Sequence, residues 1–323
     1  MINQLFILST FLVCSLSFGQ SFAPAAGQAG STAIHKDSSI IQDWATGATM
    51  QRGYLNISDP GLGFASFGEA TDALGAAEGD ATNVVSLGDS GVIVLTFNRP
   101  IENGSGPDFA VFENGFADNF LELAFVEVSS DGLNFVRFPA ISETPTNAQI
   151  GPFDYSDCRY VHNLAGKYRA GYGTPFDLED LSDSTGIDLM SITHVKLIDV
   201  VGTIDPQYGS FDSQGTIIND LYPTEFPSGG FDLDAVGVIN EAPLGIKNAN
   251  IEVALFPNPT SDFVTIETNE NHELTIYSLH GQLLDQIEAT KKRTLSTKKY
   301  ACSILFLHIK TSEGEVVKRI HVL

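Results

Sequence analysis

A carboxylate-rich segment of the chain is the strongest candidate for metal chemistry. It spans residues 199–234 and contains neither Cys nor His. Hard carboxylate oxygens suit Ca²⁺ better than Zn²⁺, and backbone carbonyls and water can complete six to eight ligands. Several uncompensated carboxylates would repel one another, so a bound cation would stabilise the segment. The segment therefore predicts a Ca²⁺ site that orders this loop, with five candidate ligands: Asp205, Asp212, Asp220, Asp232 and Asp234.

The strand-like run 231–239 leaves two interpretations of these carboxylates open. Asp232 and Asp234 share the even positions with Val236 and Val238, so strict alternation places all four on one face. If that face is buried, the carboxylates need a cation or several hydrogen-bond donors. If a bulge changes the phase of the strand, they are solvated or cap turns. Asp108 and Glu113, in a second acidic stretch, are equally compatible with turns and with ligands.

A second candidate site combines basic and aromatic residues among glycines in residues 163–176. Aromatic rings with a few placed polar groups suit sugars or flat ring ligands. The alternative is that the tyrosines pack the loop and the basic side chains pair with nearby carboxylates. The candidate ligand-binding residues are Lys167, Tyr168, Arg169, Tyr172 and Phe176.

Catalytic motifs are weak, and no catalytic residue is assigned. Residues 88–91 read Gly-Asp-Ser-Gly, as around a protease nucleophile, but they run straight into a β-branched stretch, which a tight turn explains better. Residues 21–243 contain no Gly-x-Ser-x-Gly, His-x-x-x-His or Cys-x-x-Cys. Acidic residues are too numerous to single out the carboxylate pair of a glycosidase. A non-catalytic binding protein is favoured, and a secreted polysaccharide-active hydrolase is the alternative.

The charge distribution excludes some partners and divides the chain. The net charge of −23, from 40 acidic and 17 basic residues, argues against binding to nucleic acid or to anionic lipid. Residues 1–245 hold 31 acidic and 8 basic side chains, whereas residues 246–323 hold 9 of each. Such a shift predicts two modules.

The elements that must position these residues are short strands. β-branched and aromatic runs at 92–97, 109–112, 195–200 and 231–239 are bounded by Gly, Pro and Asp, and 121–138 reads as a β-hairpin. Sustained helical periodicity is absent. The pattern predicts a jelly-roll-like β-sandwich. Residues 140–192 and 202–230 show little strand pattern, but their aromatic content predicts ordered loops over one end of the sandwich.

Both ends of the chain read as export signals. Leu5–Phe18 is an apolar run too short to span a bilayer, so residues 1–20 are predicted to be a Sec signal peptide. Cys158 and Cys302, which remain after its removal, fall in different modules, so a structural disulfide is not expected. A linker is predicted at 244–250, between a binding domain at 21–243 and a tail at 251–323.

The tail carries a specific set of motifs. Phe256–Thr260 reads Phe-Pro-Asn-Pro-Thr, Leu274–Gln282 forms a strand and a His-Gly turn, and Lys318–Val322 ends the chain. In order and spacing, residues 251–323 resemble the C-terminal sorting domain of the type IX secretion system of Bacteroidetes. The resemblance implies a small immunoglobulin-like β-sandwich that contacts the secretion machinery. It also implies export across the outer membrane, with removal of the tail and release or anchoring at the cell surface.

Residues 22–240 are similar to an uncharacterised group of bacterial cell-surface proteins. The similarity lies in Phe22–Gln28, Gly106–Asn114 and Gly230–Val236. It implies a surface or secreted role, in which corrinoid capture is a further alternative. The sequence therefore predicts a secreted or cell-surface protein that binds a carbohydrate or another small ligand, with Ca²⁺ as a possible cofactor.

Overall fold

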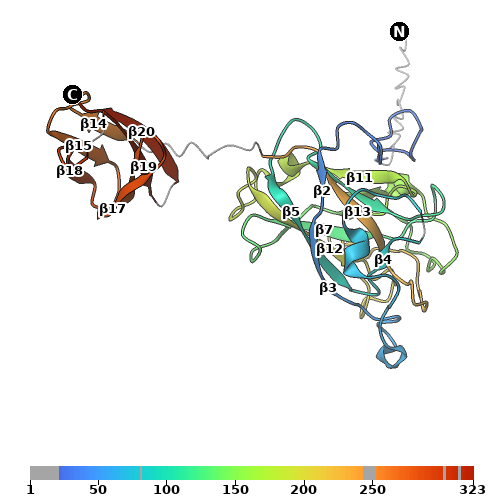
Figure 1. Ribbon diagram of the computed structural model, residues 1–323. Helices are drawn as coiled ribbons and strands as arrows, with labels where there is room; N and C mark the ends of the chain where they lie inside the picture. The colour runs from blue at the N-terminus through green and yellow to red at the C-terminus, as the bar shows by residue number, and fades with distance from the viewer. Residues whose placement is uncertain (1–21, 81, 243–251, 301–302, 312–313) are drawn as a thin grey trace, which may run out of the picture. The chain divides into compact units, whose positions relative to one another are not determined.

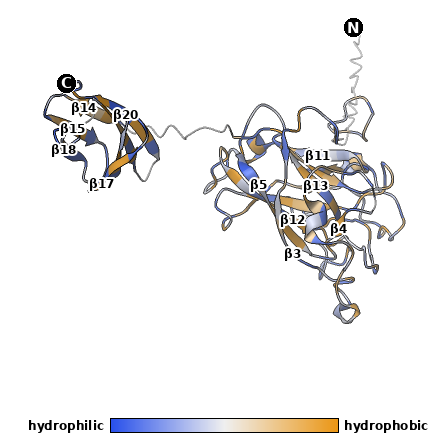
Figure 2. Ribbon diagram, in the orientation of Figure 1, coloured by the Kyte–Doolittle hydropathy of each residue, from blue (hydrophilic) through white to orange (hydrophobic). Residues whose placement is uncertain are grey.

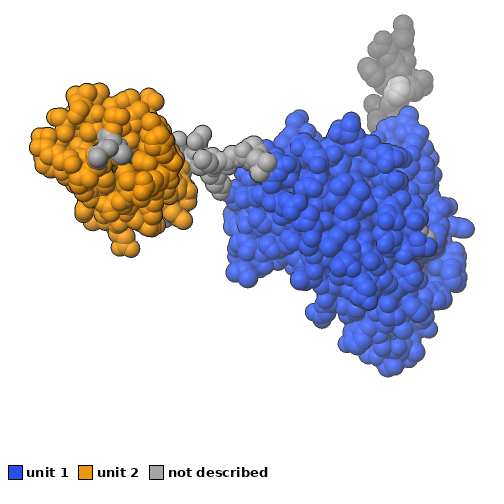
Figure 3. Space-filling view, in the orientation of Figure 1, with its two compact units in different colours: residues 1–242 blue, residues 243–323 orange. Residues whose placement is uncertain are grey.

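The computed structural model describes residues 22–80, 82–242, 252–300, 303–311 and 314–323. The predicted signal peptide and the predicted linker lie outside these residues. The chain divides into two compact units, residues 1–242 and 243–323 (Figures 1 and 3).

The N-terminal unit is built from two main antiparallel sheets (Figure 1). The first runs in the order β1 (Ile34–His35), β11 (Tyr172–Phe176), β6 (Phe109–Glu113), β13 (Asp232–Val238) and β2 (Asp43–Trp44), and β4 (Val85–Ser86) also pairs with β13. The second runs in the order β3 (Gly47–Gln51), β5 (Val92–Ile101), β12 (Ile192–Asp199), β7 (Ala124–Ser129) and β8 (Val136–Arg137).

The other elements of this unit are short. A two-stranded sheet pairs β9 (Ile141–Ser142) with β10 (Val161–His162). In the described residues the only helices are 3-10 turns: η1 (Pro60–Leu62), η2 (Ala70–Ala73), η3 (Cys158–Tyr160) and η4 (Leu178–Leu181). These observations confirm the all-β sandwich, whereas jelly-roll connectivity stays a prediction.

The main core holds apolar side chains from both sheets, including Phe109, Val126, Leu197 and Leu233. β6 is buried along its whole length because its other face is covered too, where Ala110 and Phe112 pack in a separate cluster. Because both faces of β6 are buried, residues 109–112 are all hydrophobic. A strand with one face in solvent would instead alternate hydrophobic and polar residues. Figure 2 shows hydrophobic residues along the strands, with hydrophilic stretches between them.

β13 contains the bulge that the sequence left open. Its register against β6 shifts between Leu233 and Ala235. Leu233, Val236 and Val238 therefore point into the main core, and strict alternation does not hold across Asp234. The carboxylates of Asp232 and Asp234 leave the valine face, but both remain buried, at 6 % and 2 % exposure.

The long segments at 140–192 and 202–230 are ordered by a core of their own. Leu123, Phe125, Cys158, Val161 and Ile218 belong to a cluster that packs beside the partly buried Ile198 of β12. Burial of this apolar surface offsets the conformational entropy of the loops.

The C-terminal unit consists of two antiparallel sheets. One contains β14 (Val253–Phe256), β15 (Phe263–Thr268) and β18 (Lys292–Ser296). The other contains β17 (Leu283–Ala289), β16 (His272–Ser278), β19 (Ile304–Lys310) and β20 (Glu315–His321). Alternating inward residues such as Ile266, Leu274, Leu307 and Ile320 form its core.

Candidate functional site

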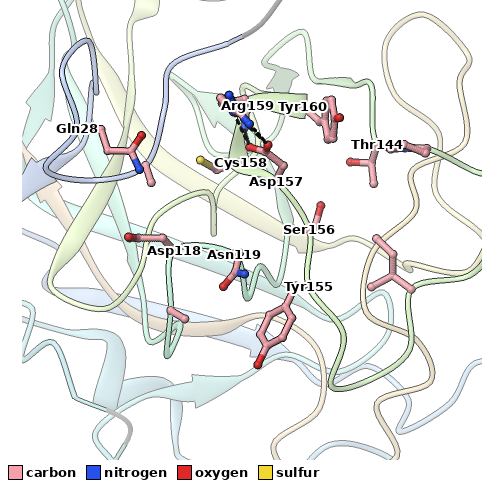
Figure 4. Close-up of a pocket in the computed structure, with 14 residues that line it drawn as sticks. Gln28, Asp118, Asn119, Thr144, Tyr155, Ser156, Asp157, Cys158, Arg159 and Tyr160 are labelled. Atoms are coloured by element: carbon pink, nitrogen blue, oxygen red, sulfur yellow. Dashed lines mark hydrogen bonds and ion pairs between the residues drawn. The ribbon is translucent and has the colours of Figure 1, made fainter.

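A cavity of about 950 Å³ opens among the loops of the N-terminal unit (Figure 4). It is lined by segments 117–119, 144–145 and 155–160, together with Ile150, Ala25 and Gln28. Two rings reach solvent here: Tyr155 is 66 % exposed and Tyr160 39 % exposed. Protein cavities of this size accommodate small-molecule ligands, and exposed rings offer stacking surfaces.

The 3-10 turn η3 builds one wall of this cavity. Asp157 caps the turn by accepting a hydrogen bond from Arg159 N, and the two side chains form an ion pair at 2.5 Å (Figure 4). The Arg159 side chain lowers the pKa of the Asp157 carboxyl. Cys158, within the turn, is buried in the loop core as a small apolar side chain.

The other walls supply hydrogen-bonding groups. The backbone carbonyl of Asn119 accepts a hydrogen bond from Ser156 N at 2.8 Å, which fixes the position of Asn119. Asp118 is paired with Arg169. The buried Thr144 hydroxyl has no hydrogen-bond partner among the described residues. Rotation of the Thr144 side chain would turn this hydroxyl toward the cavity, where a bound ligand could satisfy it.

The residues predicted to bind a ligand mostly have internal partners. Lys167 Nζ donates to the Val161 carbonyl at 2.8 Å, and burial lowers its pKa to about 8. Tyr168 is buried with its hydroxyl 2.8 Å from Thr32 Oγ1, and Phe176 stacks on Phe109 in the main core.

The remaining predicted ligand-binding residues lie nearer the surface. The Arg169 guanidinium lies 4.7 Å from the ring centre of Tyr172, and Arg169 also pairs with Asp118 of the large cavity. Of the five residues, Lys167 lines a smaller cavity of about 530 Å³, together with His162, Asp177 and Asp180.

The five aspartates predicted to bind metal do not meet at one point. Asp205 accepts from Gln207 N, and Asp212 accepts from Gln214 N, Thr216 N and Ser142 N. Asp234 accepts from Glu78 N and Gly79 N. Backbone amides thus occupy these carboxylates, because turns present free N–H groups close to them.

Asp220 and Asp232 instead belong to a group that we call the acid cluster: Glu113, Glu122, Asp199, Asp220 and Asp232. Pairing of Leu233 with Glu113 brings Asp232 beside Glu113, and Asn114 Nδ2 donates to Asp232 Oδ2 at 3.2 Å. Asp199 accepts from Phe231 N at 2.7 Å, next to Asp232, and Asp220 accepts from Leu123 N at 2.8 Å, next to Glu122.

Burial dominates the electrostatics of the acid cluster. It raises the pKa of Glu113 and Glu122 well above their usual range, and the charge of Asp232 raises both further. It raises the pKa of Asp220 to about 7 and that of Asp232 to about 6. Among the described residues, however, no three or more His, Cys, Asp and Glu side chains stand close enough to hold a metal ion. The acid cluster is therefore not a preassembled metal centre.

Sequence reasoning did not single out Glu122 or Asp199, and it left Glu113 undecided. One signal was available for Glu122, which lies between Leu121 and Leu123 at the start of an apolar run. A carboxylate within such a run is carried toward the core by its apolar neighbours, and Glu122 is partly buried. Asp108, the other undecided residue, is a structural cap whose carboxylate accepts from Gly104 N and Leu178 N.

Comparison with known proteins settles the C-terminal unit. Residues 254–323 match the model of the secretion system C-terminal sorting domain. These residues are a type IX sorting domain. The sorting domain comprises the two small sheets described above, and it marks the protein for secretion or for the cell surface.

Other comparisons do not extend this result to residues 22–242. A search of curated proteins finds no match. A biofilm-associated protein BSP domain shares 8 % identity, covering 72 % of this chain and 48 % of its own, with a TM-score of 0.21. A Lactobacillus rhamnosus beta-glucuronidase shares 12 %, covering 94 % and 46 %, with a TM-score of 0.20. The chain spans less than half of either structure, and similarity at this level carries no functional argument.

Within the described residues, no helix has the length and apolar character needed to cross a membrane.

Proposed function

We propose that residues 22–242 are a non-catalytic binding module for a carbohydrate or another small polar ligand, exported by means of the sorting domain. The observation that carries the proposal is the cavity of about 950 Å³, with its two exposed tyrosines and the unpartnered Thr144 hydroxyl. Sugars present both apolar ring faces and hydroxyl groups, which rings and hydroxyls of this kind recognise.

Binding is favoured over hydrolysis by the state of the carboxylates in this cavity. Asp118 and Asp157, its two acidic lining residues, are both paired with arginines. A glycosidase general acid needs a raised pKa, whereas Arg159 lowers that of Asp157. Polysaccharide hydrolysis and corrinoid capture remain outcomes that the binding test can reveal.

The test is a screen of the full chain against immobilised glycans and free corrinoids, followed by calorimetry of any hit. Tyr155→Ala should weaken binding about fivefold, because one stacked ring contributes on the order of 1 kcal/mol. Thr144→Val, which keeps the shape and removes the hydroxyl, should weaken it about fivefold.

Phe263→Ala, in the sorting domain, is the matched control because Phe263 is 52 % exposed and does not line the cavity. It should leave the affinity unchanged. Release of reducing ends from a glycan would contradict the non-catalytic assignment. Binding that survives both cavity substitutions would show that the ligand sits elsewhere.

A further inference from the structure

We propose that the smaller cavity of the N-terminal unit is a second binding site, which takes a small zwitterion of the α-amino-acid class. The cavity has a volume of about 530 Å³. In this assignment the ligand carboxylate binds Lys167, and the ligand ammonium faces Asp177 and Asp180, which line the same cavity. The proposal does not depend on the function proposed for the large cavity, because the two cavities share no lining residue.

Lys167 brings a buried positive charge to this cavity without a carboxylate partner. The residue is 4 % exposed. Its ammonium offers three N–H donors, of which the Val161 carbonyl accepts one, at 2.8 Å. Asp157, the carboxylate whose charge acts on Lys167, is itself paired with Arg159. Lys167 forms no ion pair within the described residues, and a buried ammonium without one is costly, so a ligand carboxylate would stabilise it.

Aromatic rings compensate this ammonium only in part. Lys167 Nζ lies 5.9 Å from the ring centre of Phe22 and 5.8 Å from that of Tyr168. Both distances are close to the outer limit of about 6 Å for a cation–π contact. Burial lowers the pKa of Lys167 only to about 8, so the side chain still carries its charge at neutral pH. A ligand carboxylate would supply the counter-charge that the rings do not.

Thr174 adds a hydroxyl to the same cavity. The residue is 4 % exposed, and its Oγ1 has no hydrogen-bond partner among the described residues. Rotation about its Cα–Cβ bond would turn the hydroxyl toward the cavity, where it could donate to the ligand carboxylate. Pro107, Pro175 and the Phe22 ring, which stacks on His162 with ring centres 5.0 Å apart, add apolar surface for the ligand side chain.

Asp177 and Asp180 give the cavity a negative side. Asp180 is exposed, and Asp177 is partly buried. Asp180 Oδ2 accepts from Asn163 Nδ2 at 3.0 Å, and Asp177 Oδ1 accepts from Glu179 N at 3.0 Å. Each contact leaves the second carboxylate oxygen available. Neither aspartate pairs with a basic side chain in the described part of the chain, so a ligand ammonium can bind here.

The arrangement of charge selects the class of ligand. Lys167 and the two aspartates line one cavity but are not paired with one another. A simple anion would be repelled by the aspartates, and a simple cation by Lys167. A neutral sugar would leave the ammonium of Lys167 without a counter-charge. A small molecule that carries both charges satisfies both sides, and a cavity of about 530 Å³ is within the size range of small-ligand sites.

The test is calorimetric titration of the full chain with a panel of L-amino acids at neutral pH. The tightest binder is then compared with two analogues that keep its side chain, one without the amino group and one without the carboxylate. Each analogue should bind about tenfold more weakly, because each loses the hydrogen bonds of one charged group. The titration should show one site in this cavity.

Variants locate that site. Lys167→Met keeps the aliphatic stem, removes the charge and should weaken binding about tenfold or more. Asp180→Asn removes one of the two carboxylate charges at an exposed position and should weaken binding about threefold. Asp183→Asn is the matched control, because Asp183 is also exposed but does not line the cavity, and it should leave the affinity unchanged. Thermal unfolding followed through Trp44, the only tryptophan, checks that each variant is folded.

Three results would overturn the proposal. One is the absence of binding of any amino acid at millimolar concentration. Another is an analogue without the amino group that binds as tightly as the amino acid, which would mean that the cavity is an anion site. The third is an affinity that Lys167→Met retains, which would place the ligand elsewhere. If Lys167→Met does not fold, the two analogues and Asp180→Asn still decide. None of these measurements uses a glycan, so their outcome is separate from that of the large cavity.

Discussion

At the scale of single residues, buried aspartates differ in the number of backbone N–H groups that donate to their carboxylates. The Asp212 carboxylate accepts three backbone amides, two of them from its own turn. Asp220 is equally buried but accepts from Leu123 N through one oxygen only, and its other oxygen is unpartnered. The turn that contains Asp212 presents free N–H groups to its carboxylate, whereas the loop that contains Asp220 directs its carboxylate toward a single N–H group, that of Leu123.

This difference predicts a pH dependence of stability in the absence of divalent cations. Asp220 and Asp232 have folded-state pKa values of about 7 and about 6, raised by burial above those of the unfolded chain. The protonated folded form is therefore favoured. Its stabilising contribution is complete below about pH 4 and is lost as the pH rises through 6–7. In EGTA the Trp44 unfolding midpoint should fall between pH 6.5 and pH 8.

Opposing groups define the window for this measurement. Burial lowers the pKa of His162, which destabilises the fold below about pH 6.5, so acidic pH is avoided. Asp199 and Glu113, with raised pKa values, act in the same direction as Asp220, while the charge of Arg52 partly opposes Asp232. Asp232→Asn should flatten the profile. A midpoint that rises from pH 6.5 to pH 8 would contradict the assignment.

At the scale of elements, packing overrides simple strand periodicity. β6 and β13 are buried along their whole lengths because apolar clusters cover both faces of their sheet. The bulge in β13 keeps Leu233 and Val236 in the main core although three positions separate them. The close approach of two backbone segments is a second constraint on the sequence, because only glycine fits where a loop crosses the end of a strand.

Gly166 provides a test of that constraint. Its φ is +82°, and a Cβ there would lie 1.7 Å from the Glu122 carbonyl oxygen. Gly166→Ala must therefore displace the entry to β7 and should lower the free energy of unfolding by about 3 kcal/mol, combining left-handed strain with overpacking. Chemical denaturation followed through Trp44 measures the change.

Gly171→Ala is the matched control. Gly171 has a similar φ of +78°, but a Cβ built on it would meet only Lys36 Cδ, at 4.0 Å. The Gly171→Ala variant should lose about 1 kcal/mol of the free energy of unfolding, which is the cost of the left-handed backbone conformation alone. Equal losses in the two variants would mean that backbone strain, and not contact with Glu122, sets the cost.

At the scale of the whole molecule, the two units differ in charge as well as in fold. The first 245 residues are strongly acidic. The sorting domain lies in residues 246–323, which hold equal numbers of acidic and basic residues. The sorting domain accounts for export, whereas the cavity and the acid cluster lie in the N-terminal unit. Export is therefore assigned to the C-terminal unit, and the proposed binding to the N-terminal unit.

Removal of the sorting domain tests this division. A chain lacking residues 254–323 should accumulate in the periplasm of a host with type IX secretion, because the export signal is gone. Cell fractionation and intact mass measure the outcome, and the exported full-length product should lack residues 1–20 and about 251–323. Trp44 fluorescence of the retained chain provides the folding control. Export of the shortened chain at the normal level would contradict the assignment.

The sequence by itself determined the all-β class, most of the strands and the sorting domain. Each follows from local patterns: β-branched runs between turn residues at 92–97 and 109–112, and the Phe-Pro-Asn-Pro-Thr motif at 256–260. Only the tertiary structure decided which polar side chains meet. It placed Tyr168 and Phe176 in the interior, assembled the cavity from separate loops, and brought Asp232 beside Glu113. The physical reason is that the burial and partners of a side chain depend on contacts between residues far apart in the chain.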